Sequence, residues 1–385
     1  MLNSQRLLTA FAICAAIGYG QTSLPGLQSG LAGYGFAKQH VVPYLGVDRH
    51  IYQLADSSNW SLTDLTGLAA KACCYIAEYP PDAAPLGSPL AAYFDGSYQN
   101  TDYIGSDNHI HDLRSYNYGW LSFDLTQMAN APDPATFTPL VVYLANGVHL
   151  NFIGKNNHVY EILMGSGFRS YDLTQLAGAP NAGVTPLAGY ATPFNGQQHV
   201  DFIGDDGHVH ELWYDGAWHH NDLTEAAEAP LARTSSGSLD GYITSNNRQQ
   251  HVNFIGEDNH VHELWYDSAW HHNDLTQATG APPALPWSSL DGYETAFNSQ
   301  QHVDFIDSNY HLHELYYSGG WHHSDLTQLL GGVPPWYEGT PLAGYVTSFD
   351  NRQHINFIDN DYHVQELWYD TAWHQTDLSA AAGVP

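Results

Sequence analysis

Residues 260–276 read HVHELWYDSAWHHNDLT, and this stretch decides the fold. Its first eight residues are rich in β-branched and aromatic side chains, which favour an extended strand. Asp267, Ser268 and Ala269 then give a short turn signal, and a second extended run begins at Trp270. The stretch therefore predicts two antiparallel strands joined by a tight turn.

The same stretch recurs along the chain. Close copies occupy residues 208–224, 311–327 and 363–379, and fainter copies occupy residues 158–174, 109–126 and 50–66. The leucine of the DLT or DLS ending returns after 60, 48, 50, 52, 51 and 52 residues. A period of about 50 with short strands is typical of β-propeller blades, whereas helical repeats of this length would show a 3.6-residue apolar period. The sequence predicts an all-β, seven-bladed β-propeller with four antiparallel strands per blade.

The fourth repeat shows the expected unit most clearly, with strands at residues 187–192, 199–204, 208–215 and 218–224. One propeller domain of residues 21–385 is expected, with repeats at about residues 30–66, 89–126, 139–174, 186–224, 239–276, 290–327 and 341–379 and an insertion at 67–88. Each terminal repeat contains its own four strands. We therefore expect the ring to close by packing between the first and last blades, without strand exchange. Pro43 adds one residue to the second strand of the first repeat, which predicts a bulge or an edge position.

Charge narrows the classes of partner. Lys and Arg number 10 and Asp and Glu number 40, for a formal net charge of -30 at pH 7. Nucleic acids and anionic membranes are therefore poor partners. The 24 histidines would offset most of this charge below roughly pH 5.5. We expect acid-dependent association or ligand release, and self-association remains open.

The N-terminus and the cysteines indicate in which cellular compartment the protein is expected. Residues 1–20 combine Arg6, an apolar run over residues 7–17 and small residues, which resembles a secretory signal peptide and is too short to insert across a bilayer. Secretion is the expectation, and the alternative is an ordered N-terminal strand of a cytoplasmic protein. Cys73 and Cys74 are adjacent, so a disulfide framework is not expected. No zinc-ligand spacing is present, and no metal or cofactor is expected.

A His and a Glu recur twelve residues apart in repeats three to seven, on the second and third strands. The pairs are His149 and Glu161, His199 and Glu211, His251 and Glu263, His302 and Glu314, and His354 and Glu366. Neighbouring strands place the two side chains within reach of one another or of a shared ligand. Carboxylate, imidazole and tryptophan together suit a monosaccharide. The candidate platforms are Trp213, Trp265, Tyr316 and Trp368 on strand three and Trp218, Trp270, Trp321 and Trp373 opening strand four.

Repeats that carry LAGY, HVDFIGDDGHVHELWYD and a tryptophan before the last strand are similar to the fucose-binding β-propeller lectins of fungi and, in blade number, to their seven-bladed bacterial relatives. In that family each site lies between blades and uses an Arg, a Glu and an aromatic residue of the adjacent blade. The resemblance covers residues 30–385 and implies the role of the family Glu for the five glutamates above. His stands where the family has Arg, and it lacks the two-pronged donation of Arg, so fucose is a weaker expectation than sugar binding. Repeats one and two depart further, with His40 and Gln53 and with Asn100 and Asp112.

Structural roles compete with these site assignments. A repeated His/Glu pair equally suits an internal hydrogen bond that fixes blade packing, and the strand-three tryptophans equally suit the core between blades. The Asp of the DLT ending suits a turn or inter-blade acceptor. Adjacent histidines such as His219 and His220 point to opposite faces of a strand, so neither they nor the similar pairs at 271–272 and 322–323 chelate one ion.

Three classes of function are relevant to a repeated propeller of this kind. The leading expectation is a non-catalytic, multivalent lectin that binds fucose or a related monosaccharide, O-methylated ones included, on glycans. A glycosidase is not expected, because the acidic groups repeat from blade to blade and none forms a single asymmetric pair. The alternative is a scaffold for protein–protein interaction, for which the insertion is the main candidate surface.

Overall fold

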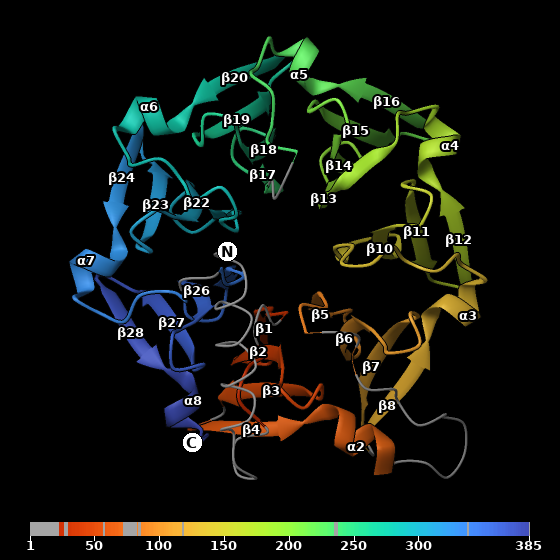
Figure 1. The fold of residues 1–385 in the computed structure, drawn as a ribbon, viewed down its shortest axis with the longest axis vertical. Coiled ribbons are helices and arrows are strands. Elements are labelled where there is room, and N and C mark those ends of the chain that lie inside the picture. Colours follow the sequence, from red (N-terminus) through yellow and green to blue (C-terminus); the bar gives the residue numbers. More distant parts are fainter. Residues whose placement is uncertain are drawn as a thin grey trace, which may run out of the picture.

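The structure is a computed structural model that describes residues 23–26, 30–56, 58–71, 83, 86–117, 119–234, 238–336 and 339–384. These residues form seven four-stranded sheets arranged in a ring (Figure 1). All strand pairs within the sheets are antiparallel, and sheet neighbours are also neighbours in the chain. The predicted seven-bladed propeller is confirmed.

The elements repeat in one order in every blade. The first strands are β1 (Tyr34–Phe36), β5 (Leu90–Phe94), β9 (Val141–Ala145), β13 (Ala182–Thr192), β17 (Leu239–Thr244), β21 (Asp291–Thr295) and β25 (Ala343–Thr347). The second strands are β2 (Gln39–Leu45), β6 (Gln99–Ile104), β10 (Gly147–Ile153), β14 (Gln197–Gly204), β18 (Gln249–Ile255), β22 (Gln300–Ile306) and β26 (Arg352–Ile358). The third strands are β3 (Ile51–Asp56), β7 (Ile110–Tyr116), β11 (Val159–Met164), β15 (Val209–Tyr214), β19 (Val261–Tyr266), β23 (Leu312–Tyr317) and β27 (Val364–Tyr369).

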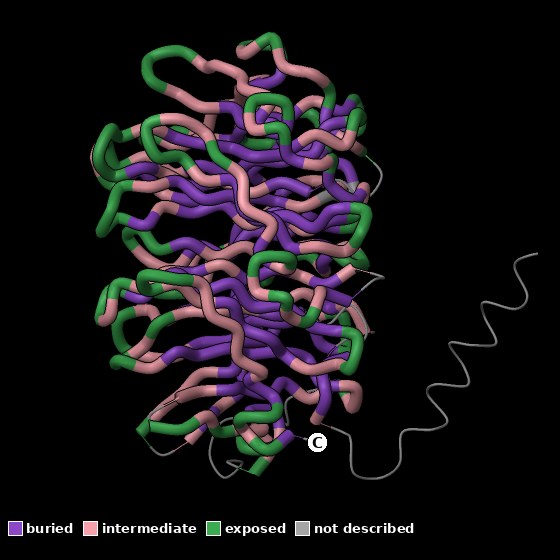
Figure 2. Tube along the Cα trace, turned by 90° about the vertical axis from the view of Figure 1, so that its left-hand side faces the viewer, coloured by how far each residue is buried: buried purple, intermediate pink, exposed green. Residues whose placement is uncertain are grey.

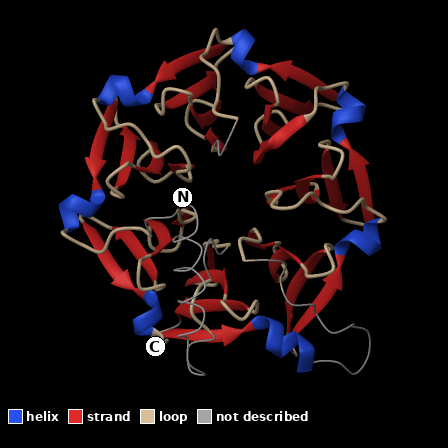
Figure 3. Ribbon diagram, in the orientation of Figure 1, coloured by secondary structure: helices blue, strands red, loops and turns tan. Residues whose placement is uncertain are grey.

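The rim carries the remaining elements. The fourth strands are β4 (Trp60–Asp64), β8 (Gly119–Asp124), β12 (Phe168–Asp172), β16 (Trp218–Asp222), β20 (Trp270–Asp274), β24 (Trp321–Asp325) and β28 (Trp373–Asp377). Short helices follow, namely α2 (Leu65–Lys71), α3 (Leu125–Ala129), α4 (Leu173–Ala177), α5 (Leu223–Ala226), α6 (Leu275–Thr279), α7 (Leu326–Leu330) and α8 (Leu378–Ala381). First strands surround the axis and the helices lie on the outer perimeter (Figure 3). Buried segments run through the middle of the disc, and exposed loops cover its two faces (Figure 2).

The DLT ending forms the junction between the fourth strand and the helix. We expected strand four of the fourth repeat to run to Thr224, but it ends at Asp222, whose carboxylate accepts a hydrogen bond from the backbone N–H of Glu225 at 2.8 Å. This is an N-cap, and it starts a helix where the strand stops. Leu223 is fully buried, and the Thr224 hydroxyl accepts from the Val209 N–H at 2.9 Å. The ending therefore fixes the helix, anchors it in the core and ties it to strand three.

Each blade buries both of its faces against its neighbours. Ile203 and Val209 of blade 4 pack in one cluster with Val252, Phe254 and Leu264 of blade 5. We call each interface between neighbouring blades a seam. Residues at alternate positions of a strand point to opposite faces, so strand three of a blade contributes to two seams. The hydrophobic core is thus a ring of seam clusters and has no single centre.

The glycine of the LAGY and LDGY motifs permits this close approach. A Cβ added at Gly241 would lie 2.7 Å from the Tyr190 ring of the preceding blade, and Gly292 and Gly344 meet Tyr242 and Tyr293 in the same way. Such distances are shorter than a side chain tolerates. The glycine is therefore a packing residue that receives the tyrosine of the preceding blade.

Among the described strands, each sheet consists of four consecutive strands, so this part of the chain closes the ring without strand exchange, as expected. Leu24 and Val42 of the first blade cluster with Val364 and Leu378 of the last. The bulge or edge position expected at Pro43 is wrong, because Pro43 pairs in continuous register with Gln53 and lies on a central strand. The Pro43 carbonyl accepts from the Ala32 N–H at 3.1 Å, so the side of the residue that lacks an N–H faces the first strand, and β1 has only three residues.

Two expectations fall outside the described residues. These are the signal peptide at residues 1–20 and the part of the insertion that contains Cys73 and Cys74. Within the described part of the chain, no helix has the length and apolar character needed to span a membrane.

Candidate functional site

The five predicted His/Glu pairs come together as expected. The Nδ1–Oε distances are 2.7 Å for His149 and Glu161, 2.7 Å for His199 and Glu211, 2.9 Å for His251 and Glu263, 2.8 Å for His302 and Glu314, and 3.1 Å for His354 and Glu366. All ten side chains are buried. The reason is the strand register, which places the residue two after each His opposite the Glu. The His and Glu are therefore diagonal neighbours on one face of the blade.

Each pair is enclosed by further hydrogen bonds, as blade 4 shows. The second oxygen of Glu211 accepts from the Asn221 amide at 2.7 Å, and Nε2 of His199 contacts the Thr192 hydroxyl at 3.2 Å. The Tyr190 ring stacks on the imidazole, with centroids 5.0 Å apart. This geometry matches the structural role weighed for the pairs. Direct contact of the pairs with a sugar stays a prediction.

The strand-three tryptophans lie further toward the exposed edge on the same face. Trp213 is directly opposite His199 across the strands, and it is partly exposed. His219 stacks on Trp213 with centroids 4.2 Å apart, and Asp215 bonds to its Nε2 at 2.9 Å. Trp265 and Trp368 form the same stack with His271 and His374, which contact Asp267 and Asp370. In blade 6 the stack is Tyr316 on His322, and Ser318 stands where the others have Asp.

The strand-four tryptophans face the other way. Trp218, Trp270, Trp321 and Trp373 are partly buried, and each packs on the hydrophobic cluster that its blade shares with the preceding blade. Trp270 also contacts Tyr266, with ring centroids 5.4 Å apart. One seam is therefore lined by the Trp213 and His219 stack of blade 4 and by Tyr266 and Trp270 of blade 5. The candidate site is this aromatic-walled edge, which recurs at the seams that follow blades 4, 5, 6 and 7.

A glutamine that the sequence reasoning missed joins the blades behind this edge. Tyr190 of blade 4 donates to Gln250 of blade 5 at 3.4 Å. Equivalent tyrosine–glutamine contacts across seams are Tyr34 to Gln99, Tyr143 to Gln198, Tyr242 to Gln301 and Tyr293 to Gln353. The signal in the sequence was the glutamine that directly precedes the His or Asn opening strand two.

Blades 1 and 2 lack the His/Glu pair, as expected. His40, however, does not lie on the face of its strand that the sequence predicted. Tyr34 pairs with Val41, whereas Tyr190 pairs with His199, so Val41 occupies the place expected for His40. His40 therefore points to the opposite face, toward blade 7. In blade 2 the Arg114 guanidinium binds Asn100 at 2.8 Å and Asp112 at 2.7 Å.

Two further sets of histidines hold the blades together internally. The His that precedes strand three contacts the Asp of the DLT ending at 2.6–3.1 Å in all seven blades, from His50 and Asp64 to His363 and Asp377. This Asp is thus an acceptor within its own blade as well as a helix cap. Imidazoles also pair across strands three and four, as in His210 with His220 at 3.0 Å. His219 and His220 have separate partners on opposite faces, as expected.

These environments shift several pKa values. Burial and the neighbouring His210 lower the pKa of His220, and burial with His262 lowers that of His272. Burial also lowers the pKa of His323. The hydrogen bond to Asp124 raises the pKa of His109. Burial and His354 lower the pKa of His40. His220, His272 and His323 are consequently biased toward the neutral form.

The residue opposite each Glu, or opposite Asp112 in blade 2, alternates around the ring. It is Asp102, Asp201 and Asp304 in blades 2, 4 and 6, and Asn151, Asn253 and Asn356 in blades 3, 5 and 7. All six are fully buried. Burial and the adjacent Glu211 raise the pKa of Asp201 well above its ordinary value, and burial with Glu314 does the same for Asp304. The raised pKa favours the protonated form of both carboxyls.

A hollow of about 250 Å³ lies elsewhere, beside β4 and α2, and its lining residues Leu62, Thr63, Asp64, Gly67, Leu68 and Lys71 include none of the predicted site residues. Comparison of the sequence with protein-family models found no match, and comparison with curated protein sequences found none either.

Solved structures share the fold. The lectin BP39L of Burkholderia pseudomallei is 13% identical, with a TM-score of 0.64 over 92% of this chain and 98% of its own. The SapL1 lectin in complex with alpha methyl fucoside is 14% identical, with a TM-score of 0.55 over 78% and 96%. The lectin of Aleuria aurantia, described as a six-bladed propeller with a novel fucose recognition mode, is 13% identical, with a TM-score of 0.51 over 78% and 96%. The chain is thus similar in architecture to fucose-binding lectins.

Proposed function

We propose that this protein is a non-catalytic lectin whose repeated sites lie at the aromatic edges of the seams. The observation that carries the proposal is the recurring stack of a partly exposed Trp on a His that an Asp holds, found in blades 4, 5 and 7. A Trp face accepts the C–H groups of a sugar ring, while the imidazole and carboxylate beside it serve the hydroxyls. The Trp that opens the fourth strand of the next blade, namely Trp270, Trp321 or Trp60, forms the second wall.

Fucose or a related monosaccharide is the proposed ligand class. Its support is the resemblance of the repeats to fucose-binding propeller lectins, together with the fold shared with the SapL1 lectin bound to alpha methyl fucoside. Several weak sites on one rigid ring would gain avidity on a surface that displays many glycans. Secretion would bring such a protein to those glycans. The proposal of secretion rests on residues 1–20, which resemble a signal peptide.

The partly exposed Trp/His stacks contact the sugar, and the buried His/Glu pairs hold the strands behind these stacks in place. The pairs are 4% exposed at most, and neighbouring protein groups satisfy both partners in blade 4. Replacing Glu211, Glu263, Glu314 and Glu366 by Gln tests the division. Lost sugar binding in a folded variant would show that the pairs contact the ligand.

A glycan array followed by calorimetric titration with methyl α-L-fucoside tests the proposed function. We expect fucosylated glycans to bind and the triple variant Trp213→Ala, Trp265→Ala, Trp368→Ala to lose about tenfold or more in affinity, as for truncated aromatic anchors. The matched control is His220→Gln, His272→Gln, His323→Gln, whose imidazoles pair inside their own blades with His210, His262 and His313, and it should bind as the unmodified chain does. Absence of binding to any glycan, or unchanged binding by the triple Ala variant, would overturn the proposal.

A further inference from the structure

The seam between blade 7 and blade 1 differs from the others in its polar residues. At the place where other blades present Gln99, Gln198, Gln250, Gln301 or Gln353 to the preceding blade, blade 1 presents His40. Across the seam, Asp350 stands where blades 4, 5 and 6 have Asn195, Asn247 and Asn298, each bonded to the Thr that ends its first strand. Two amides are thus exchanged for an imidazole and a carboxylate at one seam.

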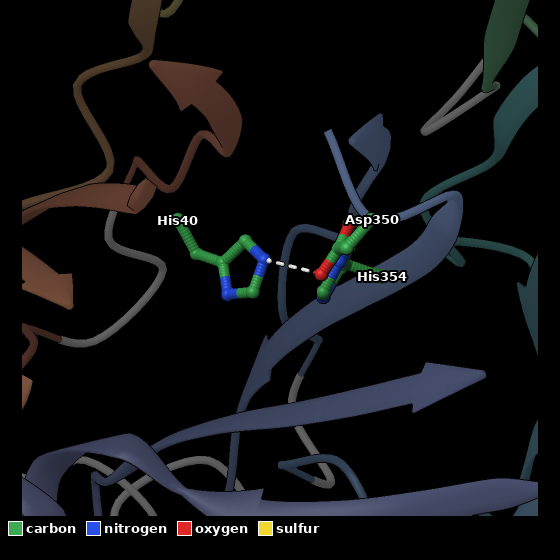
Figure 4. A group of neighbouring side chains, drawn as sticks. All are labelled: His40, Asp350 and His354. Carbon is green, nitrogen blue, oxygen red and sulfur yellow. Dashed lines mark ion pairs between the residues drawn. The ribbon is translucent and has the colours of Figure 1, made fainter. Parts of the chain in front are cut away.

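The new side chains converge on a third. Figure 4 shows His40 directed across the seam toward Asp350, with His354 beside it. One donor atom from each of the three residues lies within 4.8 Å of the others. The rings of His40 and His354 are 4.3 Å apart between centroids. Two imidazoles and one carboxylate form a donor set typical of Zn²⁺ and similar transition-metal ions.

The distance between His40 and Asp350 fits a shared ion better than a direct bond. Nε2 of His40 lies 3.5 Å from Oδ2 of Asp350, and it is buried without a hydrogen-bond partner. Two ligands held at 2.0–2.2 Å by one tetrahedral ion lie roughly 3.3–3.6 Å apart. An unpartnered buried ring nitrogen is costly in a folded protein, and a metal ion would satisfy it.

Carboxylates also support the far side of both imidazoles. Nδ1 of His40 faces Asp56 Oδ2 at 3.6 Å, and Nδ1 of His354 contacts Glu366 Oε1 at 3.1 Å. Carboxylates placed in this way orient metal-binding histidines and present Nε2 to the ion. Nε2 of His354 contacts the Thr347 hydroxyl at 3.1 Å, and this hydroxyl would turn away on metal binding.

We propose that His40, Asp350 and His354 bind a divalent transition-metal ion of the Zn²⁺ class across the closing seam. The ion joins the first blade to the last, at a place where neither a shared strand nor a tyrosine–glutamine contact does so. A ligand that binds only the folded ring stabilises it by mass action. The ion therefore stabilises the closed ring by linking its first and last blades.

Metal binding by the full chain, free of any affinity tag, tests the proposal. The probes are Co²⁺, followed by its visible absorption, and Zn²⁺, followed by calorimetry and thermal unfolding, with Mg²⁺ as the negative control. We expect one seam ion per chain and a higher melting temperature with Zn²⁺. His40→Gln and Asp350→Asn restore the residues of other seams, so both should fold, and both should weaken the seam site by about 100-fold or more.

A second variant distinguishes metal binding at this seam from metal binding at another cluster of possible ligands. Asp258, His262 and Asp274 also place three donors close together, and blade 7 carries Gln365 at the place of His262. His262→Gln should keep the seam ion. Zn²⁺ binding that is absent from the unmodified chain, or identical in His40→Gln and the unmodified chain, would overturn the proposal. The measurement involves no sugar, so it stands apart from the proposed lectin function.

Discussion

Asp201 and Asn253 occupy equivalent places in neighbouring blades, and the difference between them is one ionisable group in a dry environment. Both oxygens of Asp201 are buried without a hydrogen-bond partner, and so are both polar atoms of Asn253. Because Asp201 also lies beside Glu211, its ionised form is disfavoured and its pKa is raised. The amide fits the same space with no such dependence on pH.

We therefore expect Asp201→Asn to stabilise the protein at neutral pH. The folded state holds the Asp201 carboxyl protonated, while the unfolded chain ionises it above about pH 4. The resulting cost grows as pH rises above about 4, and it levels off only above the raised folded pKa. A gain of more than about 1.4 kcal/mol in the free energy of unfolding at pH 7.5 corresponds to a shift of over one pKa unit.

Urea unfolding at pH 7.5 and pH 4 measures this difference. The reverse change, Asn253→Asp in blade 5, is the matched control and should destabilise the protein at pH 7.5 alone. Equal or lower stability of Asp201→Asn at pH 7.5 would contradict the assignment of a protonated, unfavourably buried carboxyl.

The end of each fourth strand shows how a short motif builds an element. In blade 5, the Asp274 carboxylate accepts from the Gln277 N–H at 2.8 Å and contacts the His260 ring at 2.8 Å. Leu275 is fully buried, and the Thr276 hydroxyl accepts from Val261 N–H at 2.9 Å. Three consecutive side chains thereby stop a strand, start a helix and pin both to strand three.

Asp274→Ala removes both contacts and should lower the free energy of unfolding by about 1–2 kcal/mol, as for other lost N-caps. Asp274→Asn keeps a capping oxygen and loses only the charge that faces His260, so we expect a smaller loss. Urea unfolding of the two variants at pH 7 compares them. A loss in the Asn variant as large as in the Ala variant would argue against the cap as the main contribution.

The histidines couple the stability of the whole ring to pH. In blades 4, 5 and 6 an imidazole pair joins strands three and four, whereas blade 7 has Gln365 and Gln375 at the same places, 3.2 Å apart. A pair of imidazoles joined by one hydrogen bond accommodates one positive charge but not two. The lowered pKa values of His220, His272 and His323 are consistent with this limit.

The contribution of these three imidazole pairs to the free energy of unfolding should fall as pH decreases below about 6.5. Between the lowered folded pKa and the ordinary value, the unfolded chain binds more protons than the folded ring, so the free energy of unfolding falls with pH by about 1.4 kcal/mol per unit for each such proton. Replacing the three pairs by Gln/Gln should flatten this dependence. Histidines with raised pKa, such as His109 and His363, remain in both proteins and cancel in the comparison.

Thermal unfolding from pH 7.5 to pH 5 provides the measurement. A variant with the same pH dependence as the unmodified chain would place the proton uptake elsewhere in the molecule.

The sequence by itself determined the blade number, the four-strand unit, closure without strand exchange and the meeting of His199 with Glu211. Those properties depend on a repeat period and on strand alternation, which are local and readable along the chain. The helix after Asp222 was missed because one capped turn is too short to show helical periodicity.

Only the tertiary structure decided which face each seam residue takes. The extra residue at Pro43 is absorbed by register, so His40 faces blade 7 and not the place that spacing alone indicated. His40, Asp350 and His354 meet because the ring brings its first and last blades together, and a separation of over 300 residues hides that contact from any motif. Burial likewise separated the internal His/Glu pairs from the exposed Trp/His stacks, because depth within a seam depends on the neighbouring blade.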